Sequence, residues 1–231
     1  MSRPILSSIR TARPREVTMS LRHALLALLT ADPMTGYELV KYFDGTTANV
    51  WSAPHSQIYP ELRRMEADGL IDVREIPRGE RATKREYVVN ANGVAEFKKW
   101  LDEPAVYQSE RDVHRLRASH LELSSYESAR RQLGAHLNHY SKRLTDAQLF
   151  VADIEERRVP LLRKRLERRP EAEHEAIVAY KLFAYRGQVR KAETEIAWAR
   201  EGLELIDDLE RRQIPLYGEA FDGYREPTEL F

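Results

Sequence analysis

Several features are scarce or missing in this chain of 231 residues. It contains no cysteine, which excludes a disulfide framework and a thiolate metal site and fits a reducing compartment. Its 37 basic residues balance 37 acidic ones, so any binding to nucleic acid must come from local patches. The best candidate for a membrane helix, Ala24–Leu29, is far shorter than the roughly 20 apolar residues required. We therefore expect a cytoplasmic protein with no membrane partner.

The amino terminus also lacks the continuous apolar stretch of a secretion signal. Four arginines are scattered there among prolines and serines. We interpret residues 1–18 as a flexible basic arm.

Charged residues are plentiful, at 32% of the chain, and only ten residues are glycine, so the expected fold class is mainly α. A first helix is predicted over Ser20–Leu29, with Ser20 as its cap, because strong helix formers fill this stretch. A second helix begins at Thr35, which forms a capping box with Glu38, and stops at Asp44.

A third helix is predicted over Gln57–Asp68, where three apolar residues recur at helical spacing and Gly69 ends the run. Pro60 removes one backbone hydrogen bond if it lies beyond the first turn. The helix should therefore begin between His55 and Gln57.

A β-hairpin follows the third helix. Leu70–Ile76 and Arg85–Val89 are short β-prone runs on either side of the polar turn Pro77–Lys84. Asn90 then caps a fourth helix, which ends before Pro104. The order of three helices, hairpin and helix predicts a winged helix-turn-helix with a two-stranded β wing.

Beyond the fourth helix the sequence changes to long helices, expected to be antiparallel. One is predicted over 125–157 and another through Val178–Ile206, after a break around Pro160 and Pro170, and both carry a heptad seam. Each of these two helices is about 45 Å long and has one apolar stripe to bury. The rest of the domain is too small to cover both stripes, so a second subunit is expected. The residues predicted to form this dimer interface are Leu133, Leu137, Tyr140, Leu144, Val151, Val189, Ile196 and Leu203.

The third helix and the hairpin tip are the candidate DNA-binding elements, because the major groove is about 12 Å wide and accepts a helix. The first turn of the helix offers donors and acceptors suited to base edges, and the tip sets four basic residues against one acidic residue. An arbitrary cluster of this kind is more often a solvated surface, but its position on these two elements favours DNA binding. The predicted DNA-contacting residues are Tyr37, His55, Ser56, Gln57, Tyr59, Arg63, Arg64, Arg78, Arg81, Lys84 and Arg85.

Residues 19–103 resemble the winged-helix domain of the PadR family of bacterial transcription regulators. The stretches that carry the resemblance are Leu21–Leu29, Thr35–Leu39, Gln57–Ile71, Lys84–Tyr87 and Asn90–Gly93. Asn90 stands where the family usually has threonine, a change that preserves capping. The Tyr59-Pro60 pair matches the family's recognition helix, which implies that Tyr59 and its neighbours face the DNA backbone.

Residues 105–212 resemble the longer helical domain of the larger PadR subgroup and of related virulence-gene activators, where it mediates dimerisation. The resemblance implies a homodimer that binds double-stranded DNA. The dimer fixes the separation of its two recognition helices and so selects a palindromic operator. We expect a repressor, because a dimer lying across a promoter blocks polymerase, and the resemblance to virulence-gene activators leaves activation as the alternative. Some members respond to phenolic or multidrug compounds, so a small-molecule effector is a further expected partner, and no cofactor is expected. The expected organisation is a basic arm (1–18), a winged helix-turn-helix domain (19–104), a dimerisation domain (105–212) and a tail (213–231).

Two other classes of function compete with this interpretation. An enzyme is the first, because His136 and His139 lie three residues apart with serines and glutamates nearby. The spacing supplies neither three convergent metal ligands nor a serine on a constrained turn, so we interpret the two histidines as part of a solvated helix face. The second is a winged-helix adaptor that binds proteins without reading DNA sequence, which zero net charge favours.

Aromatic residues also occur at helical spacing and could line an effector pocket. We expect most of them to belong to the core, since such stripes more often pack a seam than bind a ligand. The residues concerned are Trp51, Trp100, Trp198, Tyr180, Phe183 and Tyr185.

Overall fold

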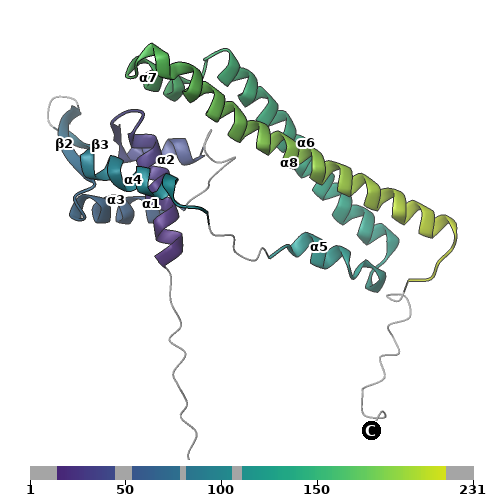
Figure 1. Cartoon of the computed structure of the whole chain (residues 1–231). Helices are drawn as coiled ribbons and strands as arrows, with labels where there is room; N and C mark the ends of the chain where they lie inside the picture. The colour runs from purple at the N-terminus through teal and green to yellow at the C-terminus, as the bar shows by residue number, and fades with distance from the viewer. Residues whose placement is uncertain (1–14, 45–53, 79–81, 106–110, 217–231) are drawn as a thin grey trace, which may run out of the picture. The chain divides into compact units, whose positions relative to one another are not determined.

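The structure of the chain is a computed structural model. The residues that it describes are 15–44, 54–78, 82–105 and 111–216. The chain divides into an N-terminal unit of Met1–Pro104 with Pro160–Arg169 and a C-terminal unit of Ala105–Val159 with Pro170–Phe231 (Figure 1). Within the described ranges, no helix is both long and apolar enough to cross a membrane.

The N-terminal unit contains the expected series of helices with their predicted caps. Its helices are α1 (Arg15–Leu29), α2 (Gly36–Asp44), α3 (His55–Ala67), α4 (Ala91–Asp102) and α7 (Pro160–Glu167). The capping box is confirmed, because the Thr35 amide donates to Glu38 Oε2 at 2.8 Å and the Glu38 amide donates to Thr35 Oγ1 at 3.3 Å. Asn90 caps α4 as predicted, and its side chain accepts hydrogen bonds from the amides of Asn92 and Gly93.

The start of α1 differs from the sequence-based expectation. The helix begins at Arg15, so Ser20 lies inside it and does not act as its N-cap. Residues 15–18, assigned above to a flexible arm, are therefore helical. The remainder of that predicted arm, 1–14, lies outside the described residues.

The sheet has one strand more than expected. Its strands are β1 (Met34–Thr35), β2 (Ile71–Arg78) and β3 (Ala82–Val89), in the order β1-β3-β2 with both pairings antiparallel. Tyr87 of β3 lies opposite Met34 on one side and Val73 on the other. The two long strands extend further toward the turn than predicted. Gly69, at φ 68°, ends α3 and lets the chain enter β2.

Helix α7 belongs to the N-terminal unit, although it was assigned above to the dimerisation domain. Leu161 lies in the same buried cluster as Leu25 of α1 and Ile58 of α3. Asp32 accepts a hydrogen bond from Lys164 and forms an ion pair with Arg168 at 2.5 Å. The predicted domain of 105–212 is therefore interrupted, because these ten residues pack where their own apolar face finds a core.

The C-terminal unit is built on two long helices. Its helical segments are α5 (Val113–Ala118), the 3₁₀ turn η1 (Leu121–Leu123), α6 (Tyr126–Glu155) and α8 (Glu171–Arg211). Ion pairs from Arg130 to Asp207 and from Arg186 to Glu155 show that α6 and α8 run antiparallel, side by side (Figure 1). The predicted helix of 125–157 is confirmed with Ser125 as its N-cap, whereas α5 was not predicted.

The predicted dimer seam is already covered in part within one chain. Leu133 is buried in a cluster with Ala129 and Ile206, and Ile196 is buried on α8. The two antiparallel helices of one chain bury their apolar stripes partly against each other, so a second subunit is not needed to cover these residues. The other six predicted interface residues are half-buried, namely Leu137, Tyr140, Leu144, Val151, Val189 and Leu203.

Candidate nucleic-acid interface

Helix α3 has one buried face and one exposed face. Its apolar residues Ile58, Leu62 and Met65 are buried in the core of the N-terminal unit. The residues predicted to contact DNA lie on the other side and are exposed, namely His55, Ser56, Gln57, Tyr59, Arg63 and Arg64. The helix therefore presents donors and acceptors to solvent while its apolar stripe fixes it in place.

The first turn of α3 is suited to an anion. It contains no acidic residue, and Pro54 at the N-cap makes no side-chain hydrogen bond. No local carboxylate therefore neutralises the positive end of the helix dipole, which favours a phosphate there. As expected, the helix starts at His55, so Pro60 lies beyond the first turn.

A buried carboxylate holds α3 against α1. Glu61, with 1% of its side chain exposed, accepts from Arg22 Nε at 2.9 Å and from Arg64 Nη1 at 3.1 Å. Arg22 also donates to Asp68 at 2.7 Å. Arg64 is thus tied to its own helix as well as exposed, a partnership that the sequence analysis did not foresee.

Of the two predicted tyrosines, Tyr59 lies at the contact between α2 and α3. A Cβ at Gly36 would come within 2.5 Å of the Tyr59 ring, so the ring packs against the start of α2 where only a hydrogen fits. Tyr59 is still 43% exposed and Tyr37 is 72% exposed. Gly36 was not predicted to contribute to the site, although it directly follows the capping residue Thr35.

The wing residues divide into three groups. Lys84 is exposed on β3. Arg78 ends β2, but its side chain lies outside the described part of the structure, as does Arg81 entirely. Arg85 donates from Nη2 to both carboxylate oxygens of Glu66, at 2.6 and 2.7 Å, and lies 5.6 Å from the centre of the Tyr87 ring.

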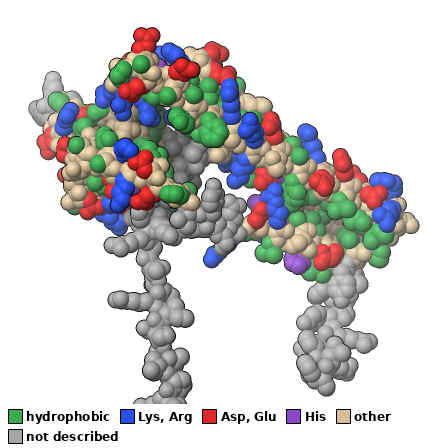
Figure 2. Space-filling model, in the orientation of Figure 1, with side chains coloured by type: hydrophobic (Ala, Val, Ile, Leu, Met, Phe, Trp, Pro, Cys, Tyr) green, Lys and Arg blue, Asp and Glu red, His purple; other side chains and the backbone are tan. Residues whose placement is uncertain are grey.

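Arg85 therefore differs from its predicted role at the hairpin tip. It lies opposite Glu75 in the strand register, three residues along β3 from Ala82, and connects the wing to α3. Hydrogen bonding to Glu66 raises the pKa of its guanidinium, which stays charged. Its charge is nevertheless balanced by the Glu66 carboxylate. On the face that Figure 2 shows, acidic and basic side chains are interspersed and form no broad cationic surface.

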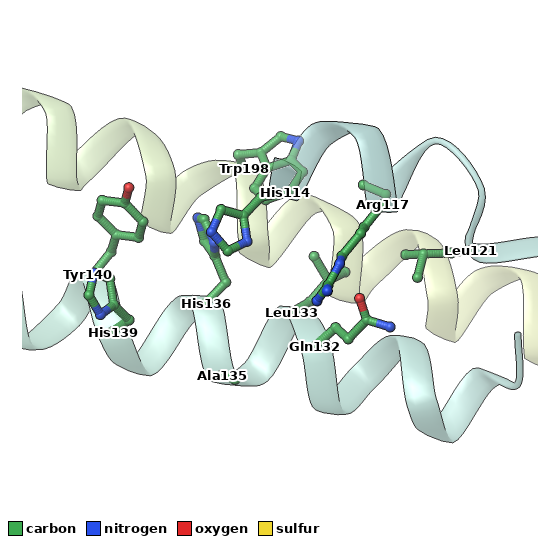
Figure 3. Close-up of a pocket in the computed structure, with 11 residues that line it drawn as sticks. His114, Arg117, Leu121, Gln132, Leu133, Ala135, His136, His139, Tyr140 and Trp198 are labelled. Carbon is green, nitrogen blue, oxygen red and sulfur yellow. The ribbon is translucent and has the colours of Figure 1, made fainter. Parts of the chain in front are cut away.

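The His136 and His139 pair belongs to no metal-binding cluster among the residues described. No group of three or more acidic or histidine side chains there could hold a metal ion. His136 is buried rather than solvated and points toward the rings of His114 and Trp198 (Figure 3). This corrects the interpretation of the His136 and His139 pair as a solvated face, and His139 alone is exposed.

Residues 25–99 match the family model described as "Transcriptional regulator PadR-like family". The chain is 37% identical over 81 residues to "Negative transcriptional regulator PadR" of Bacillus subtilis (strain 168), covering 35% of this chain and 44% of that protein. It is 36% identical over 86 residues to "Probable transcriptional regulator Rv1176c" of Mycobacterium tuberculosis, covering 37% and 46%. The chain thus spans less than half the length of these two relatives.

Solved structures are similar over most of the chain. Bacillus subtilis PadR in complex with operator DNA has a TM-score of 0.61 at 24% identity, covering 81% of this chain and 99% of that one. The same protein in complex with p-coumaric acid scores 0.57 at 25% identity, covering 81% and 98%. The Vibrio cholerae virulence activator AphA scores 0.58 at 22% identity, covering 82% and 99%. These likenesses establish the fold, including the long helices.

Proposed function

Residues 25–99 form a PadR-like transcriptional regulator domain, and from this premise we propose that the chain binds operator DNA as a homodimer and represses transcription. The observation that carries the proposal is α3, a helix with a buried apolar face and an exposed polar face inside a family-matched winged helix. Such a helix is the element that helix-turn-helix proteins insert into the major groove.

Different residues supply the specific and the general parts of binding. Gln57 and Ser56 lie in the first turn of α3, where side chains reach base edges, and Tyr59 adds a contact to the backbone. Arg63 and Lys84 are exposed cations on the two elements and add phosphate contacts that do not depend on sequence.

The dimer is proposed to form through the C-terminal helices. Because Leu133 and Ile196 are buried within one chain, the interface needs other apolar residues as well. Tyr180 and Phe183, one turn apart on α8, are 77% and 74% exposed, which corrects their assignment to the core. A second copy covering this face would fix the distance between two α3 helices and select a palindrome whose half-sites are about one turn apart.

Repression and response to a small molecule are supported by relatives. The Bacillus relative is named a negative transcriptional regulator, and its structure has been solved with p-coumaric acid. A dimer lying across a promoter blocks polymerase without a further contact. We propose the same outcome here, with release by a small effector.

Selection from random double-stranded DNA with the full-length protein tests this function. We expect enrichment of one palindromic sequence, and we expect Gln57→Ala to relax the preference among sites more than it lowers affinity for unrelated DNA. Weak binding without enrichment would instead favour the protein-binding adaptor.

The wing is tested separately with the double variant Arg81→Ala/Lys84→Ala, which leaves the Arg85–Glu66 pair in place. We expect affinity for every sequence to fall and the slope of log affinity against log salt to decrease by about one per lost phosphate contact. Unchanged binding to all sequences would remove the wing from the interface.

A further inference from the structure

The exposed face of α3 carries a carboxylate among the residues proposed to meet DNA. Of the two acidic residues in the helix, Glu61 is buried, whereas Glu66 has 38% of its side chain exposed. Tyr59, Arg63 and Glu66 follow one another at spacings of four and three residues, so their side chains share one face of the helix. A carboxylate at this place opposes binding to the DNA backbone, because its charge repels phosphates.

Glu66 is engaged by a cation of the wing. Arg85 of β3 donates from Nη2 to both of its carboxylate oxygens, at 2.6 and 2.7 Å. The Arg85 side chain is 47% exposed, so the pair lies at the surface where α3 and the wing meet. A DNA backbone lying along that surface would meet both charges together.

The pair is also close to residues proposed to contact DNA. The Arg85 guanidinium lies 5.6 Å from the centre of the Tyr87 ring. Burial raises the pKa of the Tyr87 phenol, and the charges of Arg85, Glu66 and Arg63 act on it as well. These three charged groups therefore gather around one ring at the junction of α3 and β3.

Arg63 and Lys84 differ from Arg85 in their charge balance. Both are exposed, and neither forms an ion pair with another described residue. Each adds a full positive charge at the interface, whereas Arg85 and Glu66 together add none. If Arg85 turned to a phosphate, the Glu66 carboxylate would be left unpaired beside the DNA backbone. Separating the pair therefore yields little net attraction to DNA.

We propose that Glu66 limits the affinity of the protein for DNA by holding Arg85 away from the phosphates and balancing its charge. The proposal rests on the proposed function, because it concerns the same surface. It acts on the sequence-independent phosphate contacts, however, and not on the base contacts of the first turn of α3. Its consequence is weaker retention on unrelated DNA, from which the protein is released more readily.

Fluorescence anisotropy of the full-length protein on a duplex of unrelated sequence tests this role. Glu66→Gln removes the charge, keeps the size of the side chain and frees Arg85. We expect affinity to rise about threefold or more at about 50 mM salt, and the slope of log affinity against log salt to steepen by about one, the value for one added phosphate contact. An affinity that stays the same or falls would overturn the proposal.

A double-variant cycle separates this role from that of a structural brace. Arg85→Gln should lower affinity, because it leaves Glu66 unpaired beside the backbone. Glu66→Gln/Arg85→Gln should bind about as tightly as the wild type, because the pair that it removes carries no net charge. If the pair instead braced the wing against α3, all three variants would bind more weakly than the wild type, and the proposal would be wrong. Both side chains are partly exposed, so the variants should keep their helical content, which circular dichroism checks.

Glu155→Gln is the matched control. It frees Arg186 from a partly exposed pair at 2.8 Å between α6 and α8, and it changes the net charge by the same amount as Glu66→Gln. Neither residue belongs to α3 or the wing. Affinity and salt slope should match the wild type. A rise equal to that of Glu66→Gln would mean that any added positive charge strengthens binding, which contradicts a particular role for Glu66.

A selected palindromic duplex, titrated in parallel, distinguishes this proposal from the proposed function. Glu66→Gln should strengthen binding to both duplexes by the same factor, because the added contact does not depend on sequence; a changed preference between them would contradict the proposal. Equal affinity of the wild type for both duplexes, with the expected gain in Glu66→Gln, would sink the operator and leave the role of Glu66 intact. A clear preference without that gain would do the reverse, and no binding by any variant would overturn both.

Discussion

A buried ion pair adds to the apolar packing that holds α3 against α1. The Glu61 carboxylate is almost fully buried and is shared by Arg22 of α1 and Arg64 of α3. A buried charge is costly unless each of its oxygens is paired, so removing the charge leaves two guanidinium groups without their acceptor. The orientation of the reading helix thus depends on a residue that never faces DNA.

Glu61→Gln should lower the free energy of unfolding by about 3 kcal/mol, the usual consequence of breaking a buried ion pair. Urea denaturation followed by circular dichroism measures this loss. Lys98→Gln removes half of the exposed Lys98–Asp102 pair on α4 and should cost less than about 1 kcal/mol. Equal stability of the Glu61 variant and the wild type would mean that the pair does not hold α3.

Gly36→Ala should weaken DNA binding several-fold with little loss of stability. The new methyl group would lie 2.5 Å from the Tyr59 ring, and this half-exposed ring can rotate away at small cost. Fluorescence anisotropy with operator DNA measures the loss. In a Tyr59→Ala background the same change should have no further effect; an equal additional loss there would show that Gly36 acts by another route.

Polar contacts, as well as apolar packing, join the helices α5, α6 and α8 of the C-terminal unit. Helix α5 is only six residues long, too short to be stable alone. Arg115 of α5 connects it to Glu195 of α8, which also contacts His136 of α6. The packing of α5 against α6 and α8 therefore depends on the charge state of Arg115, Glu195 and His136.

Acid should loosen α5 from the long helices. Burial lowers the pKa of His136, so the unfolded chain takes up its proton first and stability begins to fall as the pH drops below about 6.5. The pKa of Glu195 is also lowered, so its contribution is present above 4.5 and is lost as the pH falls through its folded value. Urea midpoints at pH 7, 5.5 and 4 should decrease in that order, and Glu195→Gln should flatten the last step. A midpoint that rises toward pH 4 would contradict this sign.

The helices with local end signals could be predicted from the sequence. The capping box at Thr35, the Asn90 cap and the Ser125 cap are each satisfied by neighbours within three residues, so their signals are local. The two-residue strand β1 exists only because β3 pairs with it, and α7 packs into a core formed by residues between Leu21 and Tyr87, far earlier in the chain. A local sequence pattern carries no information about contacts with residues so far away in the chain.

The DNA-binding site, like the fold, could be predicted from the sequence only where its signals are local. The exposed face of α3 followed from helical spacing, which places His55, Gln57 and Arg63 away from the buried stripe. The burial of Glu61 and of His136 did not, because their partners Arg22 and Glu195 lie 39 and 59 residues away. Polar residues become buried only where such distant partners satisfy them.

The whole molecule is proposed to act as a symmetric pair. Its long helices bury one seam against each other and leave a second set of apolar side chains exposed on α6 and α8. The members of that set are Leu149, Tyr180, Phe183 and Leu205. A single-chain state would leave these large apolar surfaces in water, which favours association.

Tyr180→Glu combined with Phe183→Glu should convert the dimer to a monomer. Both side chains are exposed within one chain, so the helical content should not change while light scattering reports half the mass. Arg200→Glu, an exposed charge change elsewhere on α8, should leave the dimer intact. A wild type that is monomeric at micromolar concentration would contradict the dimer itself.

Reading of a specific DNA sequence by α3 is measured by the ratio of affinities for selected and unrelated duplexes. Competition anisotropy at physiological salt should give a ratio of about 10³ or more for the wild type. Gln57→Ala should reduce this ratio at least tenfold while binding to unrelated DNA changes little. A wild-type ratio close to one, or a ratio that Gln57→Ala leaves intact, would contradict the assignment of α3 as the reading helix.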